Sequence, residues 1–221
     1  MAAKGAPQMI LQPLTARLSA PAAVLSAALS AQAPAEVAGA VRPIAEADAV
    51  VSFWQKSGPD RWFAKDPEFD RRFRDRFLAL HAAAARGELD GWTADASGVL
   101  ALLILLDQYR NAFRGTPRMY ATDEQARIIA DLAVWRGYDL EVPPALKLFV
   151  YLPFGHSESL VDQDRSVQLV AERLGEPSLS RAKHHQEIVR RFGRFPHRNA
   201  ILDRESTDEE LSYLAAGGYM G

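Results

Sequence analysis

The chain has 221 residues, of which 48% are hydrophobic and 24% are charged, and its formal net charge at pH 7 is -2. This composition fits one globular domain with a substantial core, and the near-neutral charge gives no global attraction to nucleic acid or to an anionic membrane. Because the sequence contains no cysteine, disulfides, thiolate nucleophiles, iron–sulfur clusters and cysteine-ligated zinc are excluded.

The first 43 residues differ in composition from the rest of the chain. Residues 1–35 are rich in Ala, Pro, Ser and Leu, and Lys4 and Arg17 are their only charges. An export signal would need a continuous apolar run, which Arg17 and Pro21 interrupt. We therefore predict an N-terminal arm over residues 1–43, partly helical at about 21–29, on a cytoplasmic protein, with export through this segment as the alternative.

Residues 44–221 are predicted to form a single all-α domain with about seven core helices, because no segment alternates apolar and polar residues as a half-buried strand does. The first helix begins at about residue 44 and ends at Gly58-Pro59. Asp66-Pro67 begins the second helix, which ends at Gly87. The run Val99–Leu106 is apolar on every side, which predicts a central helix surrounded by the others.

Capping residues, prolines and glycines predict the later helices. These are expected at residues 122–135, 144–151, 157–174 and 180–192, and from 207 onward. Two of them begin with a capping box, formed by Thr122 with Gln125 and by Thr207 with Glu210. The helix at 144–151 is expected to break at Pro153.

Helical periodicity places three polar side chains on apolar faces. Gln163 lies on the core stripe of helix 157–174, and His156 falls on the same line if that helix extends back by its first turn. His185 projects from the centre of the apolar face of helix 180–192. Burial of such groups without partners costs about 1–3 kcal/mol each, so a hydrogen-bond network, an ion or a polar ligand is expected inside.

Two polar segments follow the ends of helices. Phe192-Gly193-Arg194-Phe195-Pro196-His197-Arg198-Asn199 is a loop stiffened by a glycine and a proline. Its arginines either form a site or bind the terminal carbonyls of helices, which would stabilise the fold only. The second segment begins where the central helix ends and is either part of a site or a solvated helix end; it contains Asp107, Gln108, Arg110 and Asn111.

These segments carry a resemblance to a known family. Leu105-Leu106-Asp107-Gln108, then Tyr151-Leu152-Pro153-Phe154 with His156-Ser157-Glu158, then the loop 192–199 occur in the order found in the bacterial domain-of-unknown-function family 924. The chain resembles this family from about residue 45 to its end. The resemblance implies a tetratricopeptide-like stack of antiparallel helix pairs, although the sequence itself shows no 34-residue repeat.

Two positions depart from the family pattern. Tyr109 is followed directly by Arg110, where the family usually has one more residue, and this deletion is expected to rotate Arg110 and Asn111 by a helical step. Asp203 stands where the family often has glycine, which bears on the conformation of its loop.

The resemblance implies no activity, so function is predicted from chemistry. The first hypothesis is a polar pocket that binds an anionic small molecule and acts on it by acid–base chemistry, which requires the polar segments to converge. The predicted catalytic residues are His156, His185, His197 and Glu158. The predicted substrate-binding residues are Asp107, Gln108, Arg110, Asn111, Gln163, Arg194, Arg198 and Asn199.

Other functions are less well supported by the sequence. A helical scaffold could bind a protein or peptide in a groove. RNA is the least favoured ligand, because Glu187, Asp203 and Glu205 flank the arginines. No metal site is predicted, since no metal-ligand spacing occurs and the paired arginines repel a cation; no motif implies a cofactor, and the eight-residue apolar run is too short to span a membrane.

Overall fold

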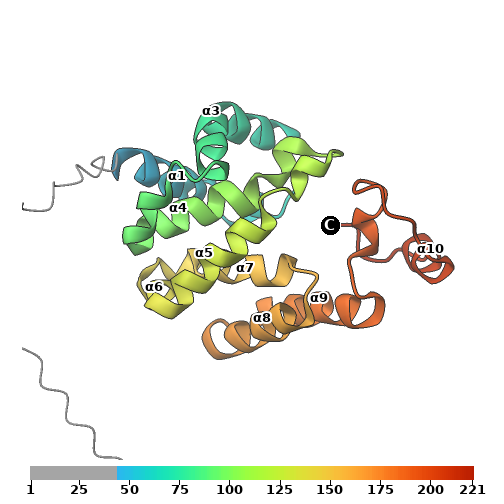
Figure 1. The fold of residues 1–221 in the computed structure, drawn as a ribbon. Helices are drawn as coiled ribbons and strands as arrows, with labels where there is room; N and C mark the ends of the chain where they lie inside the picture. The colour runs from blue at the N-terminus through green and yellow to red at the C-terminus, as the bar shows by residue number, and fades with distance from the viewer. Residues whose placement is uncertain (1–43) are drawn as a thin grey trace, which may run out of the picture. The chain divides into compact units, whose positions relative to one another are not determined.

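The computed structural model describes residues 44–221, and every regular element within them is helical, which confirms the all-α prediction (Figure 1). Eight of the ten α-helices in this part of the chain have eight or more residues, against about seven predicted core helices. The predicted arm, with its helix at 21–29, lies outside the described residues. The α-helices are α1 Ile44–Ser57, α2 Pro59–Trp62, α3 Pro67–Ala85, α4 Ala96–Asp107, α5 Asp123–Arg136, α6 Tyr138–Glu141, α7 Leu148–His156, α8 Leu160–Arg173, α9 Ser178–Phe192 and α10 Asp208–Ala215.

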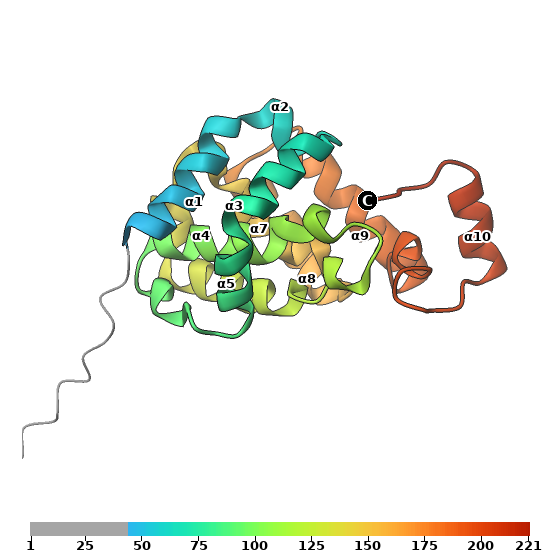
Figure 2. The same cartoon turned by 90° about the horizontal axis from the view of Figure 1, so that it is seen from above.

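Helix α4 is the centre of the hydrophobic core. Each residue from Val99 to Leu106 is at most 2% exposed. The helix contacts α1, α3, α5 and α7, which lie around it in Figure 2. The predicted central helix is therefore confirmed, because a helix that is apolar on every side has to be covered by other helices. Within the described part of the chain, no helix combines the length and the apolar character needed to cross a membrane.

Helices α7, α8 and α9 pack against one another in chain order. The predicted break of α7 at Pro153 is wrong, because this helix continues to His156. Proline removes one backbone donor but fixes a helical φ, and the extensive burial of α7 outweighs that loss. His156 consequently belongs to the last turn of α7 and not to the core stripe of α8. The tetratricopeptide-like arrangement is compatible with this packing and stays a prediction.

The helix ends follow the sequence signals in several places. Gly137 and Gly193 follow α5 and α9 with φ angles of 74° and 71°, in the left-handed region that glycine favours. At the start of α10, the Glu210 amide donates to Thr207 Oγ1 at 3.2 Å and the Thr207 amide donates to the Glu210 carboxylate at 2.8 Å. The predicted capping box of Thr207 and Glu210 is confirmed.

The predicted capping box of Thr122 and Gln125 is wrong. Thr122 Oγ1 donates instead to the Leu106 carbonyl at 2.6 Å, and Gln125 Nε2 donates to the Ala84 carbonyl at 2.8 Å. Both carbonyls belong to the last turns of helices, α4 and α3, and the Ala84 carbonyl also accepts from the Gly87 amide at 2.9 Å. The two side chains therefore satisfy the ends of neighbouring helices and not the start of their own.

The loop before α10 contains a strained backbone position. Asp203 has a φ angle of 53°, and no other non-glycine residue among 44–221 has a positive φ. Aspartate tolerates this left-handed conformation better than most residues, whereas a β-branched side chain does not. The family's frequent glycine at this position is explained by the same conformation.

We expect Asp203→Gly to leave the free energy of unfolding within about 0.5 kcal/mol of the wild type, because glycine adopts this conformation freely but gains entropy when unfolded. Asp203→Val should lower the free energy by about 1–2 kcal/mol. Urea denaturation of the three proteins measures both values. Equal stability of the valine and glycine variants would contradict the left-handed assignment.

Candidate functional site

A cavity of about 750 Å³ lies where three segments of the sequence meet. They are the segment after the central helix, the end of α7 and the loop after α9. Its lining comes from the loop before α3, from the 3₁₀-helix η2 (Gln108–Phe113), from α7 and α9, from the 3₁₀-helix η5 (Pro196–Arg198) and from residues 219–221. The roles of the lining residues in binding or catalysis stay predictions. Seven of the twelve predicted site residues line the cavity, namely Gln108, Arg110, Asn111, His156, His185, His197 and Arg198.

Asp107 and His156 form a hydrogen-bonded pair at the cavity wall. Asp107 is the last residue of α4 and is 1% exposed, and its Oδ1 lies 2.7 Å from His156 Nδ1. Because a carboxylate only accepts, His156 Nδ1 carries the proton and donates it. Arg110 Nη2 lies 3.0 Å from His156 Nδ1. The two nitrogens are close because each of them donates to Asp107 Oδ1. His156 Nε2 is then the accepting nitrogen, and it has no hydrogen-bond partner within the described residues.

The charge of Asp107 is stabilised despite its burial. Gln108 Nε2 donates to its second oxygen, and Arg110 Nη2 lies 3.3 Å from Oδ1. Burial acts to raise the pKa of Asp107, but His156 and Arg110 outweigh burial and hold that pKa below its usual value. Asp107 is therefore ionised and can stabilise a positive charge on the His156 ring.

Asp123, the first residue of α5, connects two arginines of the cavity. Its carboxylate accepts hydrogen bonds from Arg110 Nη2 and from Arg198 Nη1, each at 3.2 Å. Arg198 is 6% exposed, and its Nη2 donates to the His156 carbonyl at 2.8 Å. Its buried Nε has no hydrogen-bond partner within residues 44–221. The two guanidinium groups are thus fixed beside His156, and one of them retains an unsatisfied donor.

Sequence reasoning missed Asp123. An acidic residue in the first turn of a helix is ordinary, because it interacts favourably with the helix dipole, so nothing in the sequence distinguished this one. In the structure, burial raises its pKa and the two arginines act in the opposite direction. Sequence reasoning also missed Tyr120, which lies three residues before Asp123. In the structure, the Arg198 guanidinium lies 4.5 Å from the centre of the Tyr120 ring.

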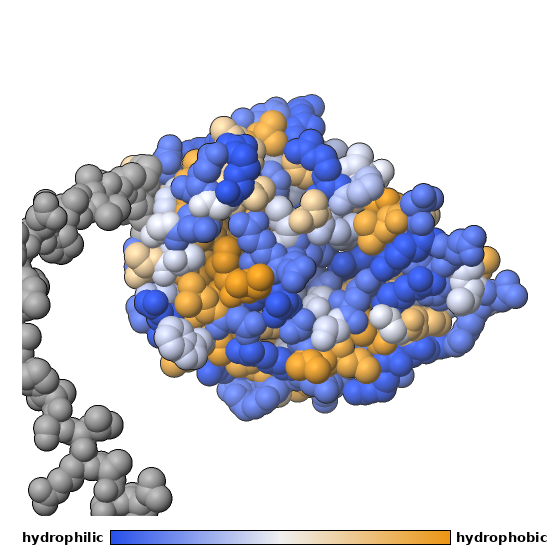
Figure 3. Space-filling model, viewed as in Figure 1, coloured by the Kyte–Doolittle hydropathy of each residue, from blue (hydrophilic) through white to orange (hydrophobic). Residues whose placement is uncertain are grey.

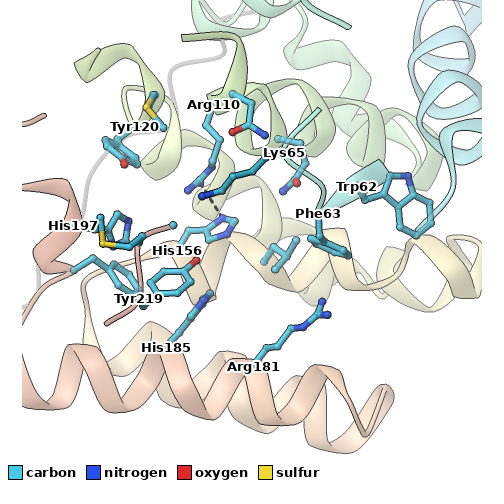
Figure 4. Close-up of a pocket in the computed structure, with 18 of the residues that line it drawn as sticks. Trp62, Phe63, Lys65, Arg110, Tyr120, His156, Arg181, His185, His197 and Tyr219 are labelled. Atoms are coloured by element: carbon cyan, nitrogen blue, oxygen red, sulfur yellow. Dashed lines mark hydrogen bonds between the residues drawn. The ribbon is translucent and has the colours of Figure 1, made fainter. Parts of the chain in front are cut away.

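Four rings gather at one end of the cavity, and we call His185, Phe195, His197 and Tyr219 the ring cluster (Figure 4). The Tyr219 ring lies 4.9 Å from that of His185 and 5.1 Å from that of His197, measured between centroids. Sequence reasoning missed Tyr219, because it follows α10 outside every recognised motif. Its position brings the segment after α10 to the same cavity as α9.

The two histidines of the ring cluster are neutral at pH 7. Burial is the main cause that lowers the pKa of His185 to about 3 and that of His197 to about 4. His185 lies close to α7, because a side chain at Gly155 would come within 3.6 Å of its Nδ1. A neutral imidazole has one donor and one acceptor, so the two histidines make this end of the cavity polar, and the charge beside them is that of Arg198, 4.8 Å from the centre of the Phe195 ring.

Arg194 and Asn199, predicted to bind substrate, do not line the cavity. The Arg194 guanidinium binds the Glu210 carboxylate through two hydrogen bonds of 2.6 and 2.8 Å, and this pairing is the main cause that lowers the pKa of Glu210 to about 2. Asn199 Nδ2 donates to Ser206 Oγ at 3.0 Å and also contacts Glu210. Both residues attach the loop 194–199 to the start of α10, but through a carboxylate and not through the terminal helix carbonyls of the fold-stabilising alternative; the arginine that binds such a carbonyl is Arg198, at His156.

Glu158 and Gln163 also lie outside the lining. Glu158 binds the Arg204 guanidinium at 2.7 and 3.0 Å and accepts from the Phe195 amide at 2.8 Å, so it orients a loop and no histidine. Gln163 is fully buried and donates to the carbonyls of Gly155 and Ser157, 2.8 and 2.7 Å away. The inward direction predicted for Gln163 is correct, and its partners are a carbonyl of the last turn of α7 and the carbonyl of the residue after that helix.

Cations outnumber acids around the cavity. Asp70 is the single acidic residue among the residues that line it, and the cations are Lys65, Arg110, Arg114, Arg181 and Arg198. Within residues 44–221 no three His, Asp or Glu side chains are grouped in a way that could hold a metal ion. The lining residues therefore carry an excess of positive charge.

The buried histidines predict acid sensitivity. His185 and His197 are neutral in the folded protein but take up protons on unfolding below their ordinary pKa of 6.5. Since the unfolded state then binds more protons, the free energy of unfolding should fall by about 1 kcal/mol per pH unit for each histidine as the pH drops from 6.5 to about 5. Replacement of His185 by glutamine should remove the contribution of one histidine, about 1 kcal/mol per pH unit, whereas His197 and His81, whose pKa is also lowered by burial, keep theirs.

The matched control is His184→Gln, which changes the exposed neighbouring histidine on α9 and should keep the wild-type slope. Chemical denaturation at four pH values measures the slopes. If His185→Gln keeps the full slope, His185 is not held neutral by burial.

Comparison with known proteins identifies the family. Residues 50–218 match the model of a family described as bacterial protein of unknown function (DUF924). The chain is similar to the solved structure of a protein of unknown function from Agrobacterium tumefaciens, with 53% identity and a TM-score of 0.76, over 78% of this chain and 98% of that chain. No curated protein matches. The chain belongs to the DUF924 family.

Proposed function

We propose that the cavity binds an anionic small molecule and that His156 performs acid–base chemistry on it. The observation that carries this proposal is the Asp107–His156 pair. The Nδ1 proton of His156 is donated to the buried carboxylate of Asp107, so Nε2 of the same ring is free to accept a proton at the wall of the cavity. A histidine oriented by a carboxylate in this way is a common arrangement for a general base.

Arg110 and Arg198 would bind the negative charge of the ligand. Both side chains line the cavity beside His156, and guanidinium groups suit the oxygens of a carboxylate or phosphate. Five cations line the cavity, against three carboxylates in or next to its wall, those of Asp70, Asp107 and Asp123. An anion therefore improves the local balance of charge.

The chemistry that follows is a proton transfer. His156 Nε2 would take a proton from a C–H or O–H group of the bound ligand, and the electron pair of that bond would stay on the ligand next to the arginines. Asp107 would stabilise the resulting imidazolium, which returns the proton in the second half of the reaction. No other group has to change its protonation state.

A second candidate function is binding of a protein partner. Large apolar side chains are exposed away from the cavity, with Ile128 and Trp135 on α5 and Leu140 on α6 exposed by 54, 77 and 62%. Figure 3 shows an apolar area over the part of the surface where Figure 1 draws α5. Exposed apolar patches of this kind are typical of interaction surfaces. This function needs none of the cavity residues.

The binding part of the proposal predicts that Arg110→Met weakens anion binding about 10- to 100-fold, because a hydrogen bond to a charged group contributes about 1.5–3 kcal/mol. A thermal-shift screen against carboxylates and phosphate esters measures it, since a ligand at a hundredfold its Kd stabilises by about 2.7 kcal/mol. Arg194→Met is the control, because its guanidinium is also paired with a carboxylate but lies outside the cavity lining. An absence of shifts, or equal losses in both variants, would reject the anion pocket.

The catalytic part predicts proton exchange. In D₂O the wild-type protein should exchange a C–H or convert a bound anion, whereas His156→Gln should bind the same anion without either change. Glutamine keeps a donor for Asp107, so the fold is expected to persist. Proton NMR of the ligand measures both reactions. If the anion binds but stays unchanged with stoichiometric wild-type protein, the catalytic part of the proposal is rejected and only binding remains.

A further inference from the structure

We infer that the anion carries an apolar body, which lies along an apolar wall formed by Trp62, Phe63, Leu148 and Leu152. This inference rests on the proposed function, because it assigns the rest of the ligand whose charged group Arg110 and Arg198 bind. In Figure 4, Arg110 and His156 lie between the labelled rings of His197 and Tyr219 on one side and those of Trp62 and Phe63 on the other. The cavity therefore has an apolar end at Trp62 and Phe63, beside which Arg181 adds one cation, and a polar part at Arg110 and His156.

Helix α7 connects the two ends. Leu148, Leu152 and His156 are spaced four residues apart, so they lie on one face of the helix, and all three line the cavity. At a rise of 1.5 Å per residue, this face passes from leucine to histidine over about 12 Å. A ligand whose anionic group lies beside His156 would place its body against the two leucines.

Helix α9 runs in the same direction along another side of the cavity, and it brings the cation of Arg181 to the apolar end. Arg181 lies 5.1 Å from the centre of the Phe63 ring, whereas His185, one turn later, belongs to the ring cluster. Both helices therefore run from the apolar end toward the histidines.

The end of α2, with Trp62, and the loop before α3, with Phe63, supply the aromatic part of the apolar wall. Phe63 is 49% exposed, and its ring stacks on Phe149 with centroids 6.1 Å apart. The Trp62 ring meets the same Phe149 edge-on at 5.1 Å, and its Nε1 donates to the Trp54 carbonyl at 2.8 Å. The polar atom of Trp62 is thus satisfied, and both rings offer carbon surface only. The exposed half of the Phe63 ring leaves apolar surface that a ligand in the cavity could contact.

The size of the cavity supports the same ligand class. A volume of about 750 Å³ is far larger than a bare phosphate or acetate requires and lies within the range of pockets that enclose drug-sized molecules. A carboxylate or phosphate ester with a hydrocarbon or aromatic body satisfies both ends. A small polyanion such as a dicarboxylate would leave the apolar wall uncovered.

The experiment compares straight-chain carboxylates of two to ten carbons with the alcohols of equal length, by isothermal titration calorimetry. The wild-type protein should bind each longer carboxylate about fourfold more tightly per added methylene until the apolar wall is covered. Phe63→Ser should flatten this increase, and Leu152→Gln, a second variant on another element, should do the same. Leu140→Ser changes an exposed leucine outside the cavity and should keep the wild-type increase.

The outcomes separate this inference from the proposed function. If all carboxylates bind equally and Arg110→Met abolishes binding, the apolar body is rejected and the anion site stands. If alcohols and carboxylates bind equally with the same increase per methylene, the anion site is rejected and the apolar wall stands. If neither series binds, both proposals are rejected.

Discussion

The buried carboxylate of Asp107 is the constraint on which the site depends. It ends the most deeply buried helix of the core, and it is itself almost inaccessible to solvent. A charge in this position is tolerated only when partners surround it, since loss of a partner from a buried ion pair costs about 3–5 kcal/mol. Those partners are Gln108, Arg110 and His156. The requirement to satisfy one carboxylate thus fixes the histidine and an arginine at the same wall.

Asp123 extends this constraint to a distant part of the sequence. It holds Arg110 with one oxygen and Arg198 with the other, which brings the end of α4 and the loop after α9 to one place. A second set of ion pairs does different work: Arg194 with Glu210 attaches that loop to α10, and Arg204 with Glu158 attaches it to the segment before α8. Arginines close together in the sequence therefore separate into one that lines the cavity and one that stabilises the fold.

Sequence reasoning could predict the helices and the segments that surround the cavity, but not which of their residues line it. The apolar run of α4 and the capping box at Thr207 are local signals, and local signals gave the right elements. Arg194 and Arg198 could not be told apart, because their directions depend on carboxylates that lie far away in the sequence. Pro153 predicts a break in α7, which would leave His156 to an extension of α8. His156 lies on α7 instead, because the burial of that helix outweighs the effect of the proline. Tyr219 reaches the cavity, and Asp123 reaches two arginines of its lining, only through tertiary contacts.

The loop that presents Trp62 and Phe63 has a consequence for how the family can diversify. These two residues and Lys65 line the cavity from one short connection between α2 and α3, whereas Arg110 and His156 are tied to a carboxylate of the central helix. Substitutions in the connection alter the apolar end without disturbing a buried charge. Under the proposed function, changes in ligand range and changes in foldability would therefore fall on separate stretches of the gene.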